Sequence, residues 1–139
     1  MTGKFKYNKE IEVRWVDLDA LNHVNNANYL TYIEQARLYY LHEVCQWDPR
    51  KSGTVLANIK IDFKQSIMLR DSPVVFVRCN RIGNKSFDLE YLIIEKDDHE
   101  KIYATGSTTM VTLDLATGKT ERVPDVYRER LSAFDGIPG

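Results

Sequence analysis

Two carboxylates, one imidazole and four asparagines crowd into one short stretch, residues 17–28, near the amino terminus. The stretch leads directly into a predicted helix, whose first N–H groups lack intrahelical partners and carry partial positive charge. Such a helix start can bind an anion or stabilise an oxyanion as it forms. A carboxylate a few residues upstream could then act on a carbonyl group held there. Aspartate and asparagine also form turns and helix caps, so the spacing alone leaves capping and catalysis both open.

Other familiar chemistries have no matching pattern in the chain. The sequence contains no G-x-S-x-G nucleophile elbow, no dinucleotide-binding or P-loop glycine pattern, and no cysteine–histidine cluster with zinc spacing. Cys45 and Cys79 form no C-x-x-C pair and are expected to be reduced, buried thiols. We therefore expect neither a metal nor a cofactor.

The overall charge is nearly balanced, with 19 lysines and arginines against 20 aspartates and glutamates. A general nucleic-acid-binding protein usually carries a basic excess, so no nucleic-acid partner is expected. The amino terminus has no apolar signal-peptide core, and the most apolar long stretch, residues 29–44, contains three charged residues. We therefore expect a cytoplasmic protein with no membrane partner.

Hydrophobic periodicity predicts one long helix among several strands. Apolar residues recur every three or four positions over residues 29–44 and occupy nearly all faces, so other elements should wrap this helix. Most other segments alternate apolar and polar residues, and the short turns between them require antiparallel neighbours. We predict strands at 7–16, 55–63, 73–80, 87–93 and 103–113, and a short terminal helix at 124–134.

These elements make an α+β protein in which one antiparallel sheet packs on one long helix. A length of 139 residues fits one domain, which we place at residues 1–139. Since one helix covers one face, the other face of the sheet must be polar, covered by another chain, or both. The threonine-rich last strand and the tyrosine-rich helix favour an oligomer.

The opening motif, Asp17-x-Asp19-x-x-x-His23-Val24-Asn25-Asn26-x-x-Tyr29, resembles that of hotdog-fold acyl-CoA thioesterases of the 4-hydroxybenzoyl-CoA thioesterase-like group. The resemblance implies a single antiparallel sheet wrapped around one long central helix, as the hydrophobic pattern also predicts. Asn22 stands where the family often has glycine, and asparagine tolerates left-handed backbone geometry better than most residues. Further matches run along the chain: Tyr29, Tyr32, Glu34, Ala36 and Arg37 in the helix, then Ile61-Asp62-Phe63, Leu69-Arg70-Asp71 and Val123-Pro124.

The resemblance also implies roles within the motif. Asp19 matches the catalytic carboxylate, acting either as a general base on water or as a nucleophile on the thioester. The backbone N–H near Asn26 would polarise the thioester carbonyl, and His23 and Asn25 are candidate substrate-binding residues. Asp17 is expected to be a structural hydrogen-bond partner. The implied substrate is an acyl-CoA or acyl-carrier-protein thioester, with coenzyme A as part of the substrate, and the implied assembly is a homo-oligomer, either a dimer or a tetramer.

Two other functions stay open at this point. A hotdog dehydratase or hydratase would act on a 3-hydroxyacyl thioester, and a non-catalytic member would only bind an acyl thioester. Retention of Asp19 favours hydrolysis. Coenzyme A would also need cationic contacts for its phosphates, for which the sequence offers five candidates without choosing among them: Lys60, Lys64, Arg70, Arg81 and Lys85.

Overall fold

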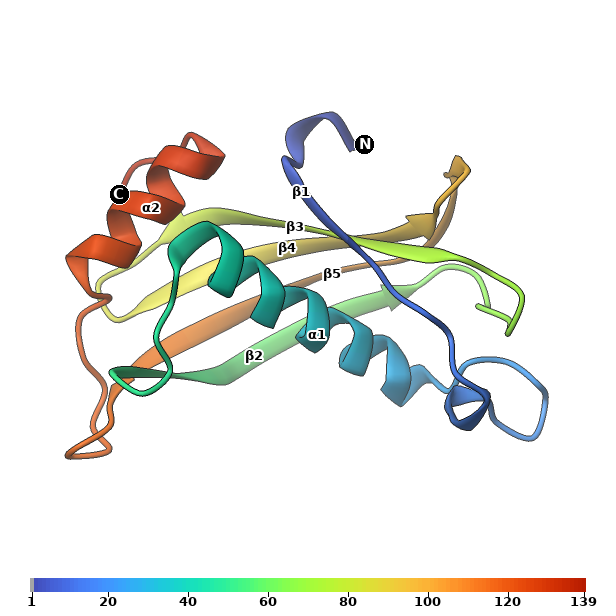
Figure 1. Ribbon diagram of the computed structural model, residues 1–139, viewed down its shortest axis with the longest axis horizontal. Helices are drawn as coiled ribbons and strands as arrows, with labels where there is room; N and C mark the ends of the chain where they lie inside the picture. Colours follow the sequence, from blue (N-terminus) through green and yellow to red (C-terminus); the bar gives the residue numbers. More distant parts are fainter. Residues whose placement is uncertain (1) are drawn as a thin grey trace.

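The computed structural model describes residues 2–139, which form one five-stranded antiparallel sheet and two α-helices (Figure 1). The strand order is β1-β3-β4-β5-β2, so β1 and β2 are the two edges. The predicted α+β class, with one antiparallel sheet on one long helix, is confirmed. The elements are β1 (Tyr7–Glu10), β2 (Ser52–Phe63), β3 (Pro73–Ile82), β4 (Ser86–Glu95), β5 (Asp98–Asp114), α1 (Asn26–Cys45), α2 (Asp125–Asp135) and the 3₁₀ turns η1 (Thr2–Lys4) and η2 (Trp15–Asp17).

Helix α1 lies across one face of the sheet (Figure 1). It begins three residues before the predicted start because Asn25 caps it, with Asn25 Oδ1 accepting a hydrogen bond from the Ala27 N–H at 2.9 Å. It ends at Cys45, where Gln46 adopts a left-handed φ of 52° and donates its N–H to helix carbonyls. The cap therefore fixes where the first N–H groups of the helix lie.

The main core fills the space between α1 and the sheet. Alternate residues of β4, including Phe87, Leu89 and Ile93, are fully buried. On the helix, Ile33 and Ala36 are at most 1% exposed. Burying one large apolar side chain contributes ~1.5–3 kcal/mol, so this layer holds α1 firmly and fixes the position of its amino-terminal end.

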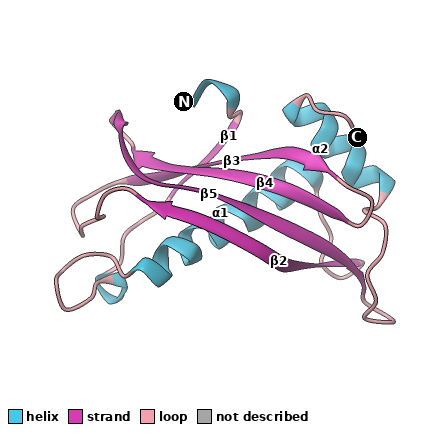
Figure 2. Cartoon of the chain, turned by 180° about the vertical axis from the view of Figure 1, so that it is seen from behind, coloured by secondary structure: helices cyan, strands magenta, loops and turns pink. Residues whose placement is uncertain are grey.

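The opposite face of the sheet, which Figure 2 shows in front of α1, is covered in part by the chain itself. It carries a smaller apolar cluster from β3 and β4, made of Val74, Phe76, Leu92 and Ile94. Phe5 covers this cluster, with its ring edge-to-face against Phe76 at a centroid distance of 5.9 Å. An ion pair between Lys4 Nζ and Glu90 Oε2, at 3.0 Å, holds the same amino-terminal segment against the sheet. No pattern in the sequence indicates that the amino-terminal segment covers this face.

The strand predicted at 7–16 is too long, because β1 ends at Glu10. Its partner β3 begins at Pro73, whose carbonyl accepts the Ile11 N–H at 3.0 Å. Within the described chain, no residue of β3 is left to pair with residues 12–16, and residues 15–17 form η2 instead. Trp15 and Val16 are each 73% exposed, contrary to the predicted alternation.

The other four predicted strands are confirmed, and each is longer than predicted at one or both ends. The terminal helix is also confirmed as α2, which Pro124 immediately precedes. Neither α-helix in the described part of the chain has the combined length and apolarity needed to span a bilayer.

Candidate active site

The Asp17 side chain is fully buried and organises the loop before α1. Its carboxylate accepts hydrogen bonds from the Arg14 N–H at 3.0 Å, from Arg14 Nη2 at 2.8 Å and from the Tyr32 hydroxyl at 2.7 Å. Burial raises the pKa of Asp17, but the hydrogen bonds from Arg14 and Tyr32 outweigh it and hold that pKa below its usual value. The carboxylate is therefore a structural group that is charged at neutral pH, and Asp17 is a structural hydrogen-bond partner as predicted.

The Asp17 backbone connects this buried network to the start of α1. Its carbonyl oxygen accepts hydrogen bonds from the Asn25 N–H at 2.9 Å and from Asn28 Nδ2 at 3.1 Å. Asn25 is the capping residue of α1, so the η2 turn and the helix start form one rigid unit. In Figure 1 the turn lies directly beside the first turn of the helix.

Asp19 lies two residues beyond this buried carboxylate and is exposed. Its Oδ1 atom accepts hydrogen bonds from the Leu21 N–H at 2.9 Å and the His23 N–H at 3.3 Å, and its own N–H donates to His23 O at 2.8 Å. Asn22 closes the turn with a φ of 62°, the left-handed geometry expected for it. Since Asp19 Oδ2 accepts no hydrogen bond from residues 2–139, it is available to a ligand or to water.

The start of α1 offers one unused donor. Of its first three N–H groups, that of Ala27 donates to Asn25 Oδ1 and that of Asn28 donates to Asn25 O at 2.8 Å. The Asn26 N–H has no acceptor among residues 2–139, and Asn26 is exposed. A lone, fixed N–H at a helix start can stabilise a negatively charged oxygen. Asn25 is thus a helix cap, and Asn26 carries the unused donor.

His23 is half-buried between this loop and the segment 64–71. Its backbone forms an isolated antiparallel bridge with Met68. Its ring makes no hydrogen bond within the part of the chain that the structure describes.

Tyr29 anchors the segment 64–71 to the site, a role that the sequence analysis missed. Its hydroxyl donates to Gln65 O at 2.9 Å and accepts the Ile67 N–H at 3.1 Å, while its ring packs edge-to-face on Phe63 at 5.1 Å. The Val24 N–H also donates to Ile67 O at 2.8 Å. The position of Tyr29 in the motif was a signal, but it gave no indication of which distant segment the hydroxyl would reach.

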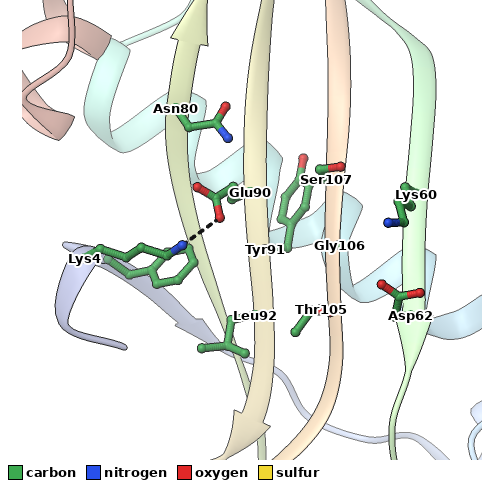
Figure 3. A pocket seen from close by; sticks show the side chains of 11 residues that line it. Lys4, Lys60, Asp62, Asn80, Glu90, Tyr91, Leu92, Thr105, Gly106 and Ser107 are labelled. Carbon is green, nitrogen blue, oxygen red and sulfur yellow. Dashed lines mark hydrogen bonds and ion pairs between the residues drawn. The ribbon is translucent and has the colours of Figure 1, made fainter. Parts of the chain in front are cut away.

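A surface hollow of about 370 Å³ is separate from this site. It lies on the face of the sheet away from α1, and none of its lining residues comes from the loop before the helix. Figure 3 shows Lys60 and Asp62 of β2 on one side, the Lys4–Glu90 ion pair on the other, and Thr105 and Ser107 between them. A smaller cavity, of about 190 Å³, lies between α1 and β2 within three turns of Asn26 and is therefore closer to the helix start. It is lined by Leu30, Thr31, Glu34, Arg37, Leu56 and Ile59.

Neither a metal centre nor a reactive thiol accompanies this site in the described chain. Residues 2–139 contain no group of three or more histidine, cysteine, aspartate or glutamate side chains placed to hold a metal ion. Cys45 and Cys79 are free and fully buried, and burial raises the pKa of each thiol to about 12. Neither thiol can serve as a nucleophile at neutral pH.

Solved structures with the same architecture establish the fold. The PA5185 protein of Pseudomonas aeruginosa superimposes with a TM-score of 0.86 over 94% of this chain and 92% of its own, at 22% identity. A thioesterase from Thermus thermophilus, crystallised in complex with coenzyme A and zinc, superimposes with a TM-score of 0.84 at 33% identity, covering 98% of this chain and 99% of its own. The expected hotdog fold is confirmed, and the site lies in a fold used by thioester hydrolases.

The chain belongs to the thioesterase-like superfamily, whose family model matches residues 13–131. Among curated proteins it is similar to the long-chain acyl-CoA thioesterase FadM of Escherichia coli, at 30% identity over 125 residues, covering 88% of this chain and 94% of FadM. The expected family and the enzyme class of thioester hydrolase are confirmed.

Proposed function

We propose that this protein hydrolyses acyl-CoA thioesters at the loop before α1. The observation that carries the proposal is the pairing of an exposed carboxylate, Asp19, with an unused N–H at the helix start, Asn26. The similarity to FadM, a long-chain acyl-CoA thioesterase, and to a thioesterase crystallised with coenzyme A supports this substrate class.

The N–H of Asn26 donates to the thioester carbonyl oxygen and stabilises the negative charge that develops on it. In one route Asp19 takes a proton from water, the water oxygen bonds to the carbonyl carbon, and the carbon–sulfur bond breaks. In the other route Asp19 attacks that carbon itself, the carbon–sulfur bond breaks to leave a mixed anhydride and the thiolate, and water then hydrolyses the anhydride. Both routes release the free acid and coenzyme A, whose thiolate takes up a proton. Because a thiolate is a good leaving group, neither route needs a strong acid beside the sulfur.

His23 and Asn25 serve the site in different ways. Asn25 holds Asn26 in place through the cap described above. His23 borders the same loop with an unpaired ring and contacts the substrate beside Asp19. The cavity between α1 and β2 accepts the acyl group, because Leu30, Leu56 and Ile59 give it apolar walls.

A second copy of the chain pairs with β2 in this proposal. This strand is a twelve-residue edge, while the other edge, β1, has four residues. Val55, Leu56 and Phe63 on β2 are 41–45% exposed. A long, apolar edge strand of this kind is an efficient template for pairing with another strand. The homo-oligomer is therefore at least a dimer, and a tetramer follows if two dimers also associate.

The test is steady-state release of free thiol from acyl-CoA esters with short, long and aromatic acyl groups, with the Asp19→Asn variant alongside. Release by the wild type that the variant loses supports the proposal and ranks the acyl groups. A folded wild type that releases no thiol but hydrates crotonyl-CoA would replace it with the hydratase. Binding without either reaction would leave a non-catalytic thioester-binding protein.

A further inference from the structure

The five cations that could bind coenzyme A phosphates lie in different parts of the molecule. Lys60 lines the hollow on the far face of the sheet (Figure 3). Arg81 is neutralised by Asp88, with Nε to Oδ2 at 3.1 Å. Lys85 lies in the β3–β4 turn, whose neighbouring residues bond to the segment before α2. That turn is at the opposite end of the sheet from the start of α1 (Figure 1).

Lys64 and Arg70 lie at the same end as the proposed catalytic loop. They bracket the segment 64–71, which the Val24 N–H and the Tyr29 hydroxyl bond directly to the loop and to the helix. Both segments occupy the same end of the molecule in Figure 1, next to the first turn of α1. The backbone of the segment that carries the two cations is thus held to the site by the Val24 N–H and by the Tyr29 hydroxyl.

Neither cation is neutralised by the residues that the structure describes. Lys64 and Arg70 are both exposed, and neither makes an ion pair or a side-chain hydrogen bond with residues 2–139. Two of the nearby acidic groups already have partners, whereas Asp19 and Asp62 form no ion pair in the described chain. Asp71 accepts the Met68 N–H at 2.8 Å and lies 3.8 Å from Lys101, and Asp17 is paired with Arg14. This end of the molecule therefore presents two exposed cations that have no ion-pair partner among residues 2–139.

We propose that Lys64 and Arg70 bind the phosphate groups of coenzyme A while its thioester lies between Asp19 and Asn26. This inference rests on the proposed function, since it concerns the carrier half of the same substrate. A guanidinium binds phosphate oxygens through two parallel hydrogen bonds, and an ammonium adds a point charge. The pantetheine arm then runs from the segment 64–71, which Tyr29 holds in place, to the start of α1.

The experiment compares two substrates that share one acyl group. One is the acyl-CoA, and the other is the acyl-N-acetylcysteamine thioester, which carries no phosphate. Lys64→Ala and Arg70→Ala should each raise KM for the acyl-CoA ~10-fold, with kcat nearly unchanged, and the double variant should raise it further. KM for the phosphate-free thioester should not change. Raising the salt concentration should reduce the difference between wild type and variants.

Lys60→Ala is the matched control, because it removes a lysine from the strand that leads into Lys64 but on the far face of the sheet. It should leave both KM values at wild-type levels. Equal losses on both substrates in the Lys64 and Arg70 variants would overturn the inference, because they would indicate a damaged loop. An unchanged KM for acyl-CoA in the double variant would overturn it as well.

Calorimetric titration with free coenzyme A, and with pantetheine for comparison, separates this inference from the proposed function. If the wild type hydrolyses neither thioester but binds coenzyme A more tightly than the double variant does, the phosphate site stands and the hydrolase proposal fails. If the double variant binds coenzyme A as tightly as the wild type, the phosphate site fails whatever the hydrolysis assay shows.

Discussion

The two ends of α1 carry equally polar clusters that differ in how far their hydrogen-bonding capacity is used. At the amino-terminal end, Asp19 and the Asn26 N–H are exposed and keep an atom without a partner in the described chain. At the carboxyl-terminal end, the Tyr40 hydroxyl donates to buried Asp135, which also accepts the Cys79 N–H at 2.9 Å. The first end leaves polar atoms free, as the proposed active site requires, and the second holds α1, α2 and β3 together.

Further contacts at the carboxyl-terminal end support this interpretation. Trp47 is 6% exposed, stacks on Tyr127 at a centroid distance of 4.1 Å and donates its indole N–H to Ser52 O at 3.0 Å. Tyr127 in turn accepts the Asp48 N–H at 2.9 Å. One carboxylate oxygen of Asp135 also lacks a partner in the described chain, but that atom is buried. Residue type alone therefore does not distinguish a binding site from a structural network. Polar atoms that are accessible and have no hydrogen-bond partner do distinguish the two.

Asp19→Asn gives the sharpest test of this difference. Thioester hydrolysis should fall ~10²–10⁴-fold, because the amide can neither take a proton from water nor attack the carbonyl. The free energy of unfolding should change by less than about 0.5 kcal/mol, since the side chain is exposed. Steady-state thiol release and urea unfolding measure the two quantities. Near-wild-type turnover would remove Asp19 from the mechanism.

Asp17→Asn should affect stability and activity together. The amide cannot satisfy Arg14 and Tyr32 as the buried carboxylate does, so the free energy of unfolding should fall by ~2–3 kcal/mol. Because the folded pKa of Asp17 lies below the unfolded value of about 3.9, its contribution is complete above that pH and is lost as the pH falls through the folded pKa. Urea midpoints measured from neutral to acidic pH check this: the difference between wild type and variant should shrink in acid, and a constant difference would contradict the assignment.

Tyr40→Phe, at the other end of the helix, should lower stability and leave activity unchanged. Loss of the hydroxyl leaves Asp135 with one donor fewer and should lower the free energy of unfolding by ~1–2 kcal/mol. The value of kcat/KM should stay at the wild-type level, because the change is far along α1 from Asn26. A clear loss of kcat/KM at a temperature where the variant is fully folded would show that the two ends are coupled.

Asn25→Ala should lower the free energy of unfolding by ~1 kcal/mol, as for other helix caps. Turnover should also fall, since the Asn26 N–H would no longer be fixed. Asn25→Asp retains a capping oxygen and should restore stability. If Asn25→Ala lowers stability without changing kcat, the position of the Asn26 N–H does not depend on the cap.

The sequence predicts local structure well where the information is local. The period of the long helix, the alternation in four strands and the left-handed Asn22 are all confirmed, because each depends on neighbouring residues. The length of β1 could not be predicted, since it depends on its partner strand β3, whose first residue, Pro73, lies more than sixty positions away. Phe5, a single apolar residue near the amino terminus, gave no pattern from which its packing on Phe76 could be inferred.

The candidate site, too, could be predicted where it depends on neighbouring residues and not where it depends on tertiary packing. The motif identifies Asp19, His23, Asn25 and Asn26, and the structure brings their backbones into one loop and helix start. The contact of Tyr29 with the segment 64–71 depends on tertiary packing, and so does the separation of Lys64 and Arg70 from the other cations. The span of a single domain over 1–139, the cytoplasmic location and the catalytic roles stay predictions.

The two tryptophans of the chain provide a built-in pair of optical reporters. Trp15 is 73% exposed on the turn that Asp17 holds beside the site, whereas Trp47 is 6% exposed and stacked at the far end of α1. Solvent-exposed and buried indoles emit at different wavelengths, so one fluorescence spectrum resolves both ends. Ligand arrival at the loop should alter the red-shifted emission of Trp15, and loosening of α2 should alter the blue-shifted emission of Trp47, without any label attached to the protein.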